Sequence, residues 1–92
     1  MIQSGHFFKH KGVRGEGAIL RTARVRSTRD CARLCMSTDG CNLYNLGPED
    51  DWTRRMQCEL VTRDIAERGV ISSDADGWVM NVRVGTVKTR CF

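Results

Sequence analysis

The residues of this sequence best suited to chemistry are its five cysteines, four of which lie between residues 27 and 60. A thiol can form a disulfide, ligate a metal or act as a nucleophile. Cys31 and Cys35 are four residues apart, so on a helix they share one face. Cys41 and Cys58 each lie in a short apolar run. Spaced cysteines in a short chain usually indicate disulfides and an oxidising compartment, which favours bridges here.

Zinc is the alternative use of these cysteines. Structural zinc sites usually place two pairs of ligands about two to four residues apart. Cys31 and Cys35 have this spacing, but Cys41 and Cys58 are seventeen apart and form no second pair. Glu49–Asp51 lacks the alternating ligands and the glycine of a calcium loop. We therefore predict no metal site and no cofactor.

A catalytic cysteine needs a nearby base to activate it. Cys91 is the only thiol expected to stay unpaired within the chain, and its position near the end offers no oriented histidine. We therefore predict that the protein is not an enzyme. Three fates remain open for Cys91, namely an intermolecular disulfide, a partner outside this segment, or a free thiol. We hypothesise a homodimer linked through Cys91.

A helix is predicted over residues 28–38, where Ser27 or Thr28 can cap its start. Asp30 follows Ser27 by three positions, which is close to a capping box, and Gly40 can take the left-handed conformation after the helix. Strands are expected at residues 6–9, 18–26, 41–46, 56–62 and 77–84, with a glycine-rich loop at 10–17, a polar loop around 49–55, a turn-like segment at 63–76 and a tail at 85–92. This pattern predicts one α+β domain spanning 1–92 with a core at about 6–84, in which a single helix packs on an antiparallel sheet.

The net charge of +4 is unevenly distributed. Residues 1–35 carry eight basic and two acidic side chains, whereas residues 36–78 carry four basic and nine acidic ones. Such a split favours an acidic partner or association of unlike faces over nucleic acid, although an ordinary solvated surface gives the same count. If they converge, the basic residues of the first part would bind a sulfated glycan or another polyanion; these candidates are Lys9, Lys11, Arg14, Arg24, Arg26, Arg29 and Arg33.

No apolar run reaches the roughly 18 residues that a membrane span requires, so no membrane insertion is expected. Met1 is not followed by the apolar core of a signal peptide. The chain is therefore either cytosolic or a mature or excised segment, and its cysteines favour the second. Trp52 lies in the polar loop. We interpret it as an anchor packed on the sheet, the alternative being an exposed contact residue.

The cysteine pattern resembles that of the PAN/apple family. Asp30-Cys31-Ala32-x-x-Cys35 matches its helix, Cys41-x-x-Tyr44 its next strand and Cys58-x-Leu60 the strand after that. The resemblance implies the pairs Cys31–Cys58 and Cys35–Cys41. Chain geometry permits this connectivity, because a bridge between Cys31 and Cys35 would fasten the helix to nothing. In the chain-entropy model the two bridges would contribute about 3.5 and 2.4 kcal/mol.

The resemblance also implies a function. Family members are extracellular binding modules, so we expect a secreted, non-enzymatic domain that mediates protein–protein contact or adhesion. The alternative is carbohydrate binding, either of sulfated, heparin-like chains through the basic residues or of a neutral sugar, as in a lectin, in a pocket near Trp52.

Overall fold

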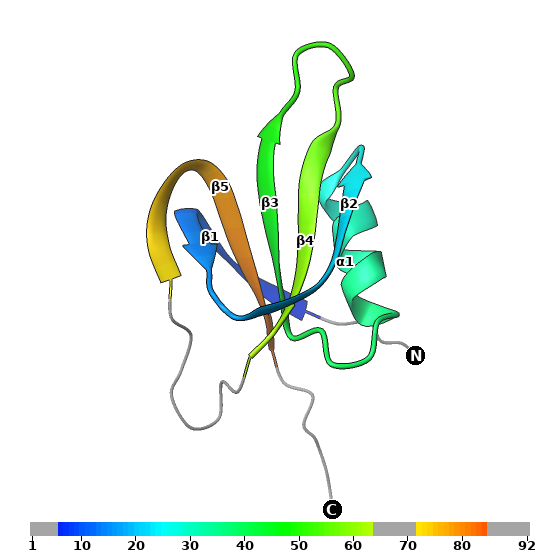
Figure 1. The fold of residues 1–92 in the computed structure, drawn as a ribbon, viewed down its shortest axis with the longest axis vertical. Coiled ribbons are helices and arrows are strands. Elements are labelled where there is room, and N and C mark those ends of the chain that lie inside the picture. The colour runs from blue at the N-terminus through cyan, green and yellow to red at the C-terminus, as the bar shows by residue number, and fades with distance from the viewer. Residues whose placement is uncertain (1–5, 64–71, 85–92) are drawn as a thin grey trace, which may run out of the picture.

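The computed structural model describes residues 6–63 and 72–84 of the 92-residue chain. In this part of the chain, one helix packs on one antiparallel sheet of five strands (Figure 1). The α+β prediction is therefore confirmed. The elements, in chain order, are β1 (His6–Gly15), β2 (Ala18–Val25), α1 (Thr28–Met36), β3 (Leu43–Glu49), β4 (Met56–Thr62) and β5 (Ser72–Val84).

The sheet has the order β1-β5-β3-β4-β2, so β1 and β2 are its two edges. α1 lies nearer to β2 than to β1 and contacts β3, β4 and β2, while Phe7 of β1 packs against the core that they form (Figure 1). The main hydrophobic core lies between helix and sheet. It contains buried side chains of α1, β2, β3 and β4 and of the turn after the helix, namely Val25, Cys31, Cys35, Cys41, Tyr44, Leu46, Cys58 and Leu60.

The opposite face of β3 and β4 is covered by the paired ends of β1 and β5. β5 bends around Gly77 (φ 82°), and the β1–β5 register shifts beside Gly12 (φ 78°), so this arm folds over the sheet (Figure 1). The backbone of the arm approaches the sheet closely at Gly15, where a Cβ would lie 2.7 Å from the sulfur of Met80 and 3.0 Å from Leu43. The Asn45 side chain fixes Gly15 by accepting from its N–H (2.8 Å) and donating to its carbonyl (2.9 Å). A second core forms beneath the arm from Leu43, Val61 and Met80.

The helix begins and ends close to the predicted residues. The Ser27 hydroxyl accepts a hydrogen bond from the Asp30 N–H at 3.2 Å, which confirms the predicted N-terminal cap. The helix ends at Met36 rather than at residue 38, because the side chains of Ser37 and Thr38 donate to the last-turn carbonyls. Gly40 then adopts the positive φ of 85° that the sequence suggested.

The strand predictions for residues 18–26 and 56–62 are confirmed to within one residue. The loop predicted at 10–17 is wrong, because a single irregularity at Gly12 lets β1 continue to Gly15. β3 likewise runs past the expected turn, to Glu49, and β5 begins at Ser72 rather than at residue 77. Cys91 and the predicted tail 85–92 lie outside the described residues.

The ionisation of Tyr44 can be used to measure the burial of the core beneath the helix. Tyr44 is 2% exposed, packs edge-on against Phe7 with ring centroids 4.9 Å apart, and is the only tyrosine of the sequence. Burial raises the pKa of Tyr44 to about 12. Ultraviolet titration of phenolate absorbance should therefore give a midpoint near 12 in the native protein and near 10 in urea.

The sign of the resulting pH dependence follows from these two values. The unfolded chain ionises its tyrosine first, so the stability that depends on a neutral Tyr44 is complete below about pH 10. It is lost as the pH rises through about 12. A native midpoint near 10 would contradict the burial of Tyr44.

Candidate functional site

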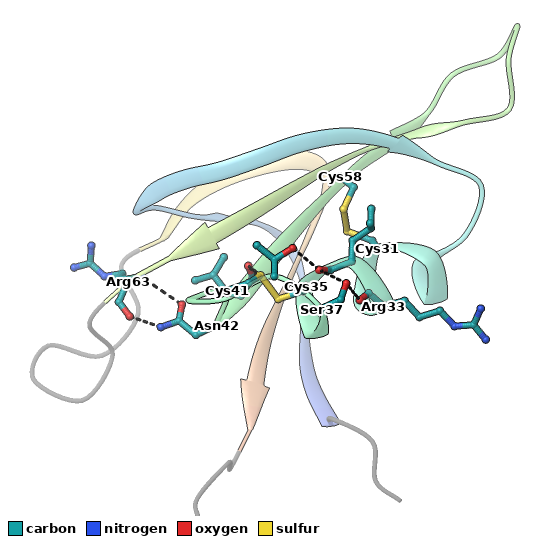
Figure 2. Close-up of a disulfide and its surroundings, with 11 residues drawn as sticks. Cys31, Arg33, Cys35, Ser37, Cys41, Asn42, Cys58 and Arg63 are labelled. Carbon is teal, nitrogen blue, oxygen red and sulfur yellow. Dashed lines mark hydrogen bonds between the residues drawn. A yellow bond between two sulfur atoms is a disulfide. The ribbon is translucent and has the colours of Figure 1, made fainter.

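Two disulfides fasten the helix. Cys31 of α1 is bonded to Cys58 of β4, and Cys35 is bonded to Cys41 in the turn after the helix, each with an S–S distance of 2.08 Å (Figure 2). These are the pairs that the family resemblance implies. All four cysteines are buried, and their pairing leaves no thiolate in this cluster to hold zinc. The first bridge joins α1 to the sheet, and the second joins it to the turn that follows.

On the helix side, a groove of about 530 Å³ lies between the end of β2 and α1. We call it the arginine groove. Four arginines line it from three segments of the chain, two at or just after the end of β2, one on α1 and one in the β3–β4 hairpin directly before β4. Figure 2 shows Arg33 extending outward from the helix, away from both disulfides. The lining residues are Arg24, Val25, Arg26, Asp30, Arg33, Leu34, Ser37 and Arg55.

Among the described residues, no arginine of the groove forms an ion pair, although Asp50 lies near enough to Arg24 for their charges to interact. Across residues 6–63 and 72–84 the structure has one ion pair, and it joins Arg14 to Glu59. The groove therefore carries four guanidinium charges against the single carboxylate of Asp30. Arginine presents a planar fork of donors that matches carboxylate and sulfate groups. The arrangement can bind an anion with more than one acidic group.

Only three of the seven predicted cations, Arg24, Arg26 and Arg33, line this groove. Lys9 and Lys11 lie on β1, at the opposite edge of the sheet. Arg29 is on α1 but is not among the lining residues, although it precedes Arg33 by one turn. The condition on which the polyanion prediction depends, convergence of the basic residues, is therefore met in this groove by these three only. The topology separates β1 from β2 by three strands.

Arg14 is held in a network of its own. Its Nε donates to Glu59 Oε1 at 2.9 Å, its second nitrogen pairs with Glu59 Oε2, and its guanidinium stacks 4.2 Å above the ring of Trp78. Glu59 is 2% exposed and also accepts from Asn45 and Gln57. The hydrogen bond with Glu59 raises the pKa of Arg14. Arg14 therefore serves to neutralise a buried carboxylate rather than to offer a free charge.

Trp52 is 94% exposed, so its interpretation as an anchor on the sheet is wrong. It lies in the β3–β4 hairpin, which extends beyond the rest of the sheet (Figure 1). The tip is ordered by Asp50, whose side chain accepts from the N–H groups of Trp52 (2.7 Å) and Thr53 (3.1 Å). These bonds, led by that from Thr53, hold the pKa of Asp50 below its usual value, and the charge of Arg24 acts in the same direction.

The hairpin and the arginine groove form one continuous surface. A second hollow, of about 610 Å³, shares Arg26 and Arg55 with the groove and is also lined by Glu49, Thr53 and Arg54. Sequence reasoning missed Arg55. The strand register carries the signal, because Val25 pairs with Met56 and the next positions outward are Arg26 and Arg55.

Within the described parts of the chain, no three histidine, cysteine or acidic side chains are grouped closely enough to hold a metal ion. None of the helical residues described there forms a span long and apolar enough to cross a bilayer.

A family model described as the PAN domain matches residues 5–81. The chain belongs to the PAN domain family. No curated protein and no solved structure gives a significant match. PAN domains are generally non-enzymatic modules that bind protein or carbohydrate in extracellular proteins. The helix, the antiparallel sheet and the two disulfides of this chain are consistent with the PAN fold.

Proposed function

We propose that this PAN domain is secreted and binds a protein partner, and that the partner contacts Trp52 and the arginine groove. The observation that carries the proposal is the 94% exposure of Trp52 on a tip ordered by Asp50, beside four arginines that form no ion pair within residues 6–63 and 72–84. Tryptophan and arginine are the residues most enriched among those that dominate protein–protein binding energy. The buried disulfides support secretion, since such bonds persist in oxidising compartments.

The test uses the immobilised domain as bait to capture a partner from the secreted and matrix proteins of the organism that produces it. Trp52→Ala is expected to cost about 2 kcal/mol of binding, or about 30-fold in affinity, because a large side chain at the centre of the contact is removed. The fold should not change, since Trp52 packs on nothing.

Phe8→Ala is the matched control for this experiment. Phe8 is also an exposed aromatic residue (63%), but it lies on β1 at the opposite edge of the sheet. We expect the Phe8→Ala variant to capture the same partners as the native domain and the Trp52→Ala variant to lose them. Recovery of the same partners by both variants would refute the proposal.

The convergence of Arg24, Arg26, Arg33 and Arg55 favours a second candidate function, the binding of a sulfated glycan. In that case Arg24→Gln/Arg33→Gln should elute from a heparin column at clearly lower salt than Lys9→Gln/Lys11→Gln, although both variants have the same net charge. Equal elution of the two, or elution of the native domain no later than from a plain cation exchanger, would count against a glycan site.

We further propose that Cys91 links two copies of the chain. The number of cysteines supports this proposal, because the other four of the five pair with one another and leave Cys91 without a partner from among them. A non-reducing gel should then show a band at twice the monomer mass that disappears with Cys91→Ser. A band at monomer mass alone would end this proposal.

A further inference from the structure

The floor of the arginine groove is apolar. Val25 and Leu34 line it among the guanidinium groups, and both are fixed by the main core, Val25 as a buried member and Leu34 packed against it. A ligand that carried only charges would leave this surface in contact with water. A ligand with an apolar group between its charges would remove it from water.

The groove also contains a hydrogen-bond acceptor. The Asp30 carboxylate lines it, and among the described residues this carboxylate has no ion pair and no hydrogen bond, since only its backbone N–H is engaged, by Ser27. A continuous polyanion would be repelled by Asp30. A peptide can instead donate its backbone N–H groups to it.

We propose that the arginine groove binds an acidic peptide segment with an aromatic residue between carboxylates. One face of the aromatic ring lies on the groove floor, mainly on Leu34 because Val25 is only 5% exposed, and a neighbouring guanidinium group stacks on the other face. The flanking carboxylates pair with the arginines, and a peptide N–H donates to Asp30. This inference rests on the proposed function, because it names the chemistry by which a protein partner is recognised.

The size of the groove agrees with this occupant. At about 530 Å³ it lies within the range of about 300–1,000 Å³ typical of sites that enclose a small ligand. The arginines come from both β2 and α1, and from the hairpin beside them, so anionic groups on either side of a central ring all meet a guanidinium. A single isolated carboxylate would use only part of this set.

The test uses a fluorescent synthetic peptide with one tyrosine between two pairs of glutamates, and measures its affinity for the full chain by anisotropy. Replacing the tyrosine by alanine keeps the charge, and is expected to weaken binding about tenfold. Arg33→Gln should weaken binding of the tyrosine peptide about tenfold as well, through loss of a charge-assisted contact.

Arg29→Gln provides the control, because it removes the same charge from the same helix outside the groove. It should change the affinity less than about twofold. Equal binding of the tyrosine and alanine peptides would overturn the inference. Tighter binding of a heparin-derived hexasaccharide in the groove than of the tyrosine peptide would also overturn it.

The proposed function can fail separately. If the peptide does not bind while capture of a partner still depends on Trp52, the inference is wrong and the proposed function stands. If capture is also insensitive to Trp52→Ala, both are wrong.

Discussion

Replacing both Cys31 and Cys58 by alanine is expected to lower the free energy of unfolding by about 3.5 kcal/mol. The bridge closes a long loop, since its two cysteines are 27 positions apart, and it is the covalent link from α1 to the sheet. Its loss frees the unfolded chain and leaves small side chains in a fully buried site. Urea unfolding of the two proteins, followed by circular dichroism, measures the difference.

The second disulfide is the control for this effect. Cys35 and Cys41 are only six positions apart, so Cys35→Ala/Cys41→Ala should cost less, about 2.4 kcal/mol. Both costs are a large part of the net stability of a small domain. A smaller loss from the long loop than from the short one would show that the loop-closure argument does not govern this fold.

Arg14→Met is expected to be the most damaging substitution of a single charged residue. It leaves the carboxylate of Glu59 buried without its cation. Breaking a fully buried pair in this way costs about 3–5 kcal/mol, but the Arg14 side chain is 40% exposed, so we expect about 2 kcal/mol. The loss should appear as a lower urea midpoint with an unchanged slope.

The double variant Arg14→Met/Glu59→Gln distinguishes coupling from simple loss of packing. Removing the charge of Glu59 as well should recover at least about 1 kcal/mol of the cost, because no unpaired charge then remains inside. Lys11→Met on the same strand serves as control, since Lys11 is exposed. If the losses caused by Arg14→Met and by Glu59→Gln, each measured alone, add up to the loss in the double variant, the ion pair does not stabilise the arm.

The sequence predicts the helix well because its signals are local. Ser27 and Asp30 are three residues apart and form the cap directly, and the cysteine motif contains the two pairs that the structure holds together. Strands 18–26 and 56–62 are also predicted from local signals, since apolar and polar side chains alternate along part of each segment. Gly12, in contrast, signals a turn, but here it introduces a single irregularity within a strand that continues.

The site depends on contacts that are distant along the chain. Arg14 meets Glu59 across 45 positions, so its neutralisation is invisible without the sheet order. Arg55 joins Arg26 only through the register of β2 and β4. Trp52 is exposed because the hairpin extends beyond the helix, and the sequence carries no measure of that length.

The arginine groove exists only if α1 is bonded to the sheet as described, because Arg33 and Leu34 lie between the two cysteines of the helix. A tryptic map without reduction tests this directly, because trypsin cleaves between the two bridges; its sites around them are Arg29, Arg33, Arg54, Arg55 and Arg63. We predict that peptide 30–33 is linked to peptide 56–63, and that peptide 34–54 contains its own internal disulfide. Peptide 30–33 linked to peptide 34–54 would contradict both the fold and the binding surface built on it.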